Sequence, residues 1–79
     1  MIPYFAITYR LLEKHLDGTL TPFERTRDIY SANVRAKTKE QAVERLKRDF
    51  NMLTVEIVAV SDKMEMTVEE YKNGSERND

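Results

Sequence analysis

The sequence predicts one small α+β domain of ββαβ type, with a three-stranded sheet and one main helix packed on one face. Two patterns support this class. The segments 4–12 and 28–36 place apolar residues at every second position, which is the period of a half-buried strand, and the segment 53–60 is rich in β-branched residues. Between the second and third segments, apolar residues recur at helical spacing. The 79 residues suffice for one domain, which we place at residues 1–72, followed by a polar and flexible tail at 73–79.

The first predicted strand covers residues 4–12, because every second residue is apolar. Its apolar face consists of Phe5, Ile7, Tyr9 and Leu11. In the connection that follows, Asp17-Gly18 predicts a tight turn. Thr21, Pro22 and Glu24 form the pattern of a helix start, so we expect a short helical turn there.

The second predicted strand covers residues 28–36, where Tyr30, Ala32, Val34 and Ala36 alternate with polar residues. Residues 22–34 could instead form a helix, because Tyr30 and Val34 also stand at helical spacing from Phe23. The sequence leaves this choice between strand and helix open.

The main helix is predicted over residues 39–50. Thr38 and Gln41 form a capping box at its start, and Asn51 can end it in the left-handed conformation. Its apolar face consists of Ala42, Val43, Leu46 and Phe50. The third strand covers residues 53–60, where β-branched residues are frequent.

This order predicts a sheet with the first strand in the centre. The second strand pairs with it antiparallel, the helix crosses over, and the third strand runs parallel to the second. Residues 64–72 remain open. Met64, Met66 and Val68 alternate like a fourth, edge strand, whereas Thr67 and Glu70 form a capping box for a short helix that Gly74 would close.

Composition argues against most kinds of catalytic or metal site. The chain has no cysteine, which fits a reducing compartment, and we expect a cytoplasmic protein with no membrane association. The single histidine, His15, lies two residues from Asp17 in a turn, without a nucleophile beside it. Asp62, Glu65, Glu69 and Glu70 are expected to form a solvated acidic face. We therefore predict no enzyme activity, no metal, no cofactor and no small-molecule substrate.

Basic residues surround the second strand and suggest one possible binding surface. Residues 1–50 hold ten Lys and Arg against seven Asp and Glu, a net charge of +3. Aromatic residues beside arginines on a sheet are typical of single-strand RNA binders. An RNA- or DNA-binding module using Arg25, Arg27, Arg35 and Lys37 is therefore the alternative function, unless Tyr9 and Tyr30 belong to the core.

The face of the sheet opposite the helix is the preferred candidate, because its expected side chains are apolar: Tyr4, Ala6, Leu12, Ile29, Val58 and Val60. Either residues 64–71 fold over it or a partner covers it. We assign protein binding to Tyr4, Ile29, Val58 and Val60, with another protein or a second copy of the chain as partner.

The strand ending Val34-Arg35-Ala36-Lys37-Thr38, followed by Gln41-Ala42 in an amphipathic helix and an apolar strand, resembles many small accessory proteins of phages and mobile elements. It is also similar to small ribosomal-type α+β proteins. The resemblance covers residues 28–61 and is architectural, so it transfers no functional residue. It implies a non-enzymatic inhibitor or adaptor that covers a partner's surface. The sequence does not name the partner, the pathway or the oligomeric state.

Overall fold

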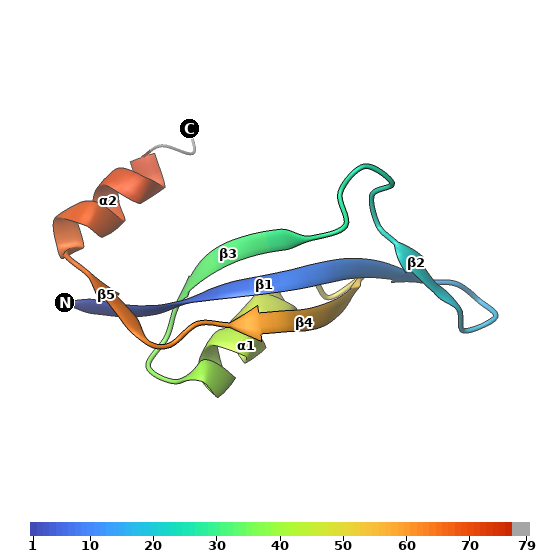
Figure 1. Ribbon diagram of the computed structural model, residues 1–79, viewed down its shortest axis with the longest axis horizontal. Coiled ribbons are helices and arrows are strands. Elements are labelled where there is room, and N and C mark those ends of the chain that lie inside the picture. Colours follow the sequence, from blue (N-terminus) through green and yellow to red (C-terminus); the bar gives the residue numbers. More distant parts are fainter. Residues whose placement is uncertain (77–79) are drawn as a thin grey trace.

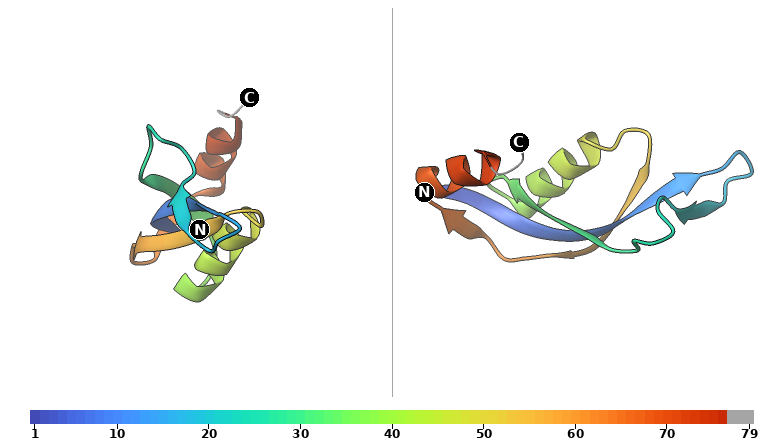
Figure 2. Two further views of the ribbon diagram at one scale, coloured as in Figure 1. Left: turned by 90° about the vertical axis from the view of Figure 1, so that its right-hand side faces the viewer. Right: turned by 90° about the horizontal axis from the view of Figure 1, so that it is seen from above.

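The computed structural model describes residues 1–76 and has an α+β architecture, as predicted. Five strands form one antiparallel sheet, with α1 packed against one of its faces and α2 beyond the end formed by β5 (Figures 1 and 2). The strands are β1 (Ile2–Lys14), β2 (Leu20–Pro22), β3 (Tyr30–Arg35), β4 (Thr54–Val60) and β5 (Met64–Met66), and the helices are α1 (Lys39–Arg48) and α2 (Val68–Glu76). The sheet thus has more strands than the three or four predicted, because two short segments also pair with β1.

The long strand β1 lies in the centre of the sheet (Figure 1). β2 and β3 pair with one of its edges, and β4 and β5 pair with the other, all of them antiparallel. β3 and β4 therefore run in the same direction, and α1 crosses between them, as the sequence predicted. This arrangement leaves each of the four outer strands with one open edge, and β3 and β4 are the longest of them.

The core lies between the sheet and α1. Every second residue of β1 is buried, and α1 and the segment before it add three more buried side chains. The buried residues are Phe5, Ile7, Tyr9, Leu11, Ala36, Ala42 and Leu46. The Tyr9 ring stacks on Tyr30 with 5.6 Å between centroids and lies 5.8 Å from the Phe50 ring. The predicted face of β1 is therefore confirmed, and both tyrosines belong to the core region.

α1 begins where the capping box predicted. The Gln41 N–H donates to the Thr38 Oγ1 at 3.1 Å, and the Gln41 Oε1 accepts from the Lys37 N–H at 2.8 Å. The helix ends at Arg48, and Asp49 caps it in a right-handed conformation. No residue other than glycine has a positive φ within residues 1–76, so the left-handed ending predicted for Asn51 is wrong.

A β-bulge in β4 changes the direction of its last side chains. Thr8 pairs with Ala59 but Tyr9 pairs with Ile57, so Val58 is the extra residue. Beyond the bulge, Val60 pairs with the fully buried Ile7 and packs against the core. The prediction that Val60 lies on the face opposite the helix is therefore wrong, because strict alternation does not survive an inserted residue.

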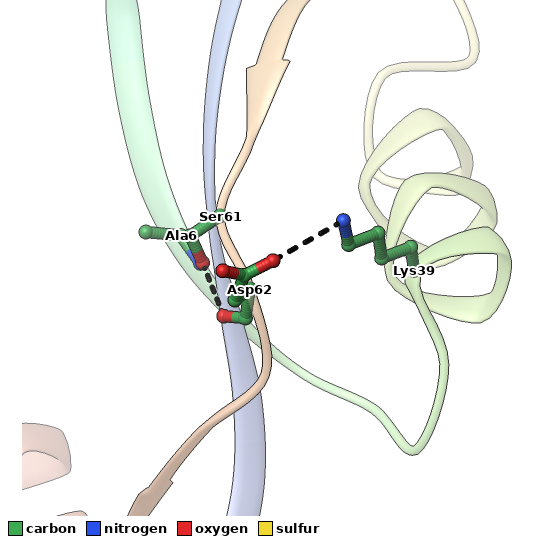
Figure 3. Close-up of polar contacts among 4 residues, drawn as sticks. All are labelled: Ala6, Lys39, Ser61 and Asp62. Carbon is green, nitrogen blue, oxygen red and sulfur yellow. Dashed lines mark hydrogen bonds and ion pairs between the residues drawn. The ribbon is translucent and has the colours of Figure 1, made fainter.

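Ser61 connects the end of β4 to β1 (Figure 3). Its N–H donates to the Ala6 carbonyl at 2.9 Å, and its Oγ accepts from the Ala6 N–H at 2.9 Å. The hydroxyl thus replaces a backbone carbonyl at the point where the chain passes from β4 to β5. Next to it, the Lys39 Nζ lies 3.6 Å from the Asp62 Oδ1, which links this junction to the start of α1.

Two ambiguous segments are decided by pairing with β1. The helical turn expected at Thr21 is wrong, because Thr21 pairs with Glu13 in β2 and completes a hairpin around Gly18, whose φ is +89°. The chain at 30–35 is a strand, and the alternative helix over residues 22–34 is not formed.

The C-terminal segment contains both of its proposed elements, β5 and α2. The Glu70 N–H donates to the Thr67 Oγ1 at 3.1 Å, and the Glu70 Oε1 accepts from the Thr67 N–H at 3.4 Å, as the capping box predicted. α2 continues past Gly74 to Glu76, so it includes the first part of the tail expected at 73–79, and residues 77–79 of that tail lie outside the described residues.

Candidate functional site

The sheet face opposite α1, here called the outer face, is less apolar than its sequence pattern predicted. Ile29 and Val58 are about half exposed, at 49% and 48%. A row of charge crosses the middle of this face, because the Arg10 guanidinium lies 3.7 Å from Asp28 and 3.8 Å from Glu56. A partner covering the middle of the outer face would have to desolvate these three charged groups.

β5 and α2 contact one end of the outer face. Tyr4 pairs with Met64 on one side and Arg35 on the other, and all three side chains share the outer face. α2 lies beyond this end of the sheet (Figure 1), and the Arg35 guanidinium lies 5.4 Å from the centre of the Tyr71 ring. Val68 and Tyr71 remain 55% and 39% exposed, so the predicted cover by residues 64–71 is formed only in part.

The four residues assigned to protein binding are therefore not gathered into one patch. Tyr4 lies on the outer face, Ile29 lies in the connection before β3, Val58 is the unpaired residue of the bulge, and Val60 packs against the core. Tyr4 stands six positions from Arg10 along β1, about 20 Å at the rise of an extended chain. The four residues could form one site only if β4 alternated strictly and if the residues lay close together along β1. The bulge breaks the alternation, and the separation along β1 is large.

The basic residues of the alternative function are also spread out. Arg25 and Arg27 lie in the exposed connection before β3, and the Arg27 guanidinium is 5.3 Å from the centre of the Tyr30 ring. Arg35 and Lys37 lie at the opposite end of β3. Two clusters therefore form at the two ends of the strand, rather than one basic stripe.

The tyrosines that would stack on bases are not displayed on the surface. Tyr9 is 6% exposed, and the Tyr30 hydroxyl is buried. Burial raises the pKa of both hydroxyls above the usual tyrosine range. These rings belong to the aromatic part of the core, which removes the stacking surface that the nucleic-acid alternative required.

A hollow lies along β3 and is lined by residues of β3, α1 and α2. Its volume is about 590 Å³, and its walls combine β3 residues with Arg45, Leu46 and Arg48 from α1 and Tyr71 from α2. A second hollow of about 430 Å³ at the end of the sheet shares Arg35 and Arg45 with it. The edge of β3 is therefore the floor of a recess with guanidinium groups on its walls.

Arg45 holds the end of this edge in place. Its Nη1 donates to the Arg35 carbonyl at 2.7 Å, which joins α1 to the last residue of β3. Sequence reasoning identified Arg35 but missed Arg45 and Arg48. Arg45 and Arg48 stand three residues apart on the polar face of the predicted helix, so the sequence places both on the same side of that helix. Only the packing of α1 on the sheet shows that this side borders β3.

The histidine of the β1–β2 hairpin, His15, contacts a threonine and not Asp17. The His15 Nε2 lies 2.7 Å from the Thr21 Oγ1, and the Asp17 carboxylate accepts from the N–H and hydroxyl of Thr19. These two hydrogen bonds hold the pKa of Asp17 below its usual range. Within residues 1–76, no three His, Cys, Asp or Glu side chains converge as metal ligands, and no helix is long and apolar enough to cross a membrane.

Comparisons of the chain with protein-family models, with curated proteins and with solved structures found no match.

Proposed function

We propose that this chain is a small non-enzymatic protein-binding module of the cytoplasm, an inhibitor or adaptor that acts by covering a partner's surface. The observation that carries the proposal is the open edge of β3 at the floor of a 590 Å³ hollow. Open strand edges pair readily with other chains, so proteins usually protect them. An edge left accessible inside a recess is suited to bind another polypeptide.

The two longest edge strands, β3 and β4, differ in this protection. β4 carries the bulge at Val58, which interrupts its regular edge. β3 has the continuous register of six pairs with β1, and its sequence, Tyr-Ser-Ala-Asn-Val-Arg, contains no proline and one charged residue. β3 therefore lacks the devices that commonly prevent pairing of an edge strand, which favours a binding role for that edge.

The non-enzymatic part of the proposal is supported by the hairpin. His15 contacts Thr21, while Asp17 contacts Thr19, so the two groups are not arranged as a base with its orienting carboxylate. The resemblance to small phage accessory proteins remains a prediction, since no match bears on it.

A position-specific photo-crosslinking experiment tests the proposal. A benzophenone amino acid would replace Asn33, which is exposed on β3, or Leu16, which is fully exposed on the hairpin. Both variants would be irradiated in nuclease-treated extract of the cells from which the chain comes, and adducts identified by mass spectrometry. We expect a protein adduct from position 33 and none from position 16. Equal adducts from both positions, or none from either, would contradict the proposal.

Nucleic-acid binding stays the alternative function, because Arg35, Arg45 and Arg48 meet at the same hollow. A backbone-binding surface predicts affinity that falls steeply with salt, and loss of binding in the double variant Arg27→Glu, Arg35→Glu. We expect no meaningful binding of random RNA or DNA oligonucleotides at physiological salt in a fluorescence-anisotropy titration. Submicromolar, salt-sensitive binding would establish the alternative in place of protein binding.

A further inference from the structure

The outer edge of β3 presents unpaired backbone groups at regular spacing. The Ala36 N–H donates to the Pro3 carbonyl, which sets the phase of the antiparallel ladder between β3 and β1. In that phase, Val34, Ala32 and Tyr30 bond to β1, and the residues between them direct their N–H and C=O groups outward. The outward residues are Ser31, Asn33 and Arg35.

The Arg45 side chain occupies the last outward carbonyl of this edge, that of Arg35. Within residues 1–76, the hydrogen bond from Arg45 to the Arg35 carbonyl is the one that reaches the outward groups of β3. The N–H and C=O of Ser31 and Asn33 and the N–H of Arg35 remain available. They span about 13 Å of extended chain, which matches a segment of about five residues.

The surroundings of this edge suit an acidic strand. Arg45 and Arg48 line the hollow on the α1 side and Arg35 lines it near Tyr71, whereas Asp49 is the one acidic residue of the lining. Glu44, outside the lining, lies 3.2 Å from the Arg48 guanidinium, so three guanidinium groups stand against two carboxylates. A strand added here would direct every second side chain toward α1. Carboxylates at those positions would meet guanidinium groups, which bind them in a geometry that lysine does not provide.

The charges also argue against a second copy of the chain at this edge. Two β3 strands paired about a two-fold axis would bring both sets of Arg35, Arg45 and Arg48 to one interface. Like charges that face each other across an interface oppose association. The charges therefore favour an acidic segment from a different protein.

We propose that β3 binds an extended, acidic segment of another protein as an additional strand, with its acidic side chains alternating toward α1. This rests on the proposed protein-binding function and specifies the partner's chemistry. Backbone hydrogen bonds to Ser31, Asn33 and Arg35 supply the pairing, and Arg45 and Arg48 select the charge.

The backbone pairing is tested by replacing one N–H. Asn33→Pro removes an outward N–H and leaves the ladder to β1 intact, since proline is tolerated at such edge positions. Asn33→Thr is the matched control, because it changes the same side chain and retains the N–H. The probe is a fluorescein-labelled eight-residue peptide of alternating Glu and Val, titrated by anisotropy. We expect the peptide to bind the wild type and Asn33→Thr, and its affinity to fall at least tenfold for Asn33→Pro.

The charge selection is tested by Arg48→Glu against Lys47→Glu. Both variants change the net charge equally, but Lys47 lies away from this hollow, beside Glu40 and Val43. We expect Arg48→Glu to weaken binding of the Glu-Val peptide and Lys47→Glu to leave it within about twofold. A Lys-Val peptide should bind more weakly than the Glu-Val peptide to the wild type.

An amide-exchange measurement makes the test independent of the proline variant. With wild-type protein and ¹⁵N NMR, bound Glu-Val peptide should slow exchange of the Ser31 and Asn33 amides. Unchanged exchange of these amides at saturating peptide would overturn the proposal, as would equal binding of the Asn33→Pro and Asn33→Thr variants. So would tighter binding of an eight-nucleotide oligo(U) RNA, or a wild-type dimer that Asn33→Pro converts to monomer.

The two proposals fail in different ways. A protein adduct at position 33, together with a Glu-Val peptide that does not bind, would leave protein binding in place and reject the acidic strand. The absence of a position-specific adduct would instead count against protein binding as such.

Discussion

Leu46 is the one large side chain of α1 that is buried against the sheet. It is 3% exposed, and the other fully covered residue of the helix is the small Ala42. Opposite it, the buried side chains of β1 are fixed in a strand that is paired on both edges. Leu46→Ala would therefore leave a cavity that neighbouring side chains cannot readily fill.

The expected cost follows from that burial. Leu→Ala substitutions in cores destabilise by about 2–5 kcal/mol, and sites that cannot collapse lie in the upper part of the range. A domain of this size has a total stability of about 4–12 kcal/mol at 0.05–0.15 kcal/mol per residue. A loss of ~3 kcal/mol is thus a large fraction of the whole and corresponds to a Tm lowered by about 12–24 °C.

Urea denaturation and thermal melting followed by circular dichroism measure this cost. Leu16→Ala is the matched control, because Leu16 is fully exposed at the hairpin, and its free energy of unfolding should change by less than ~0.5 kcal/mol. A loss below ~1 kcal/mol for Leu46→Ala would refute the position of α1 on the sheet.

Three further predictions follow from the β4 bulge, the Ser61 junction and the buried tyrosines. Val60→Lys should lower the free energy of unfolding by more than ~2 kcal/mol because Val60 faces the core. Val58 is half exposed, so Val58→Lys should lower it by about 0.5 kcal/mol or less. Equal melting temperatures of the two variants would contradict the bulge. Ser61→Ala should cost ~1–3 kcal/mol in urea denaturation because the Ala6 N–H loses its acceptor, and the exposed Ser31→Ala should be neutral. Burial raises the pKa of Tyr9 and Tyr30, so these hydroxyls lose their protons in the unfolded state first as the pH rises. The stability of the wild type should therefore be unchanged up to about pH 10 and fall above it. A melting temperature that does not change over this alkaline range would refute the burial of the two hydroxyls.

The local patterns of the sequence determined the class and the main elements of this fold. The alternation at Phe5, Ile7 and Tyr9 identified the core face of β1, because a strand exposes successive side chains to opposite faces. The capping box at Thr38 and Gln41 located the start of α1, because both partners lie within one turn. Such signals depend on neighbours in the chain, so they can be recognised without the tertiary structure.

The candidate site was decided by contacts between distant segments. The bulge that turns Val60 inward depends on how β4 pairs with β1, and the strand at 20–22 forms because β1 offers it a partner. Arg45 meets the end of β3 only because α1 packs beside it. The sequence by itself therefore determined the core face of β1, the start of α1 and the strand β4. Only the tertiary structure decided that one strand edge stays open beneath arginines, because edge pairing and side-chain convergence arise between residues far apart in the chain.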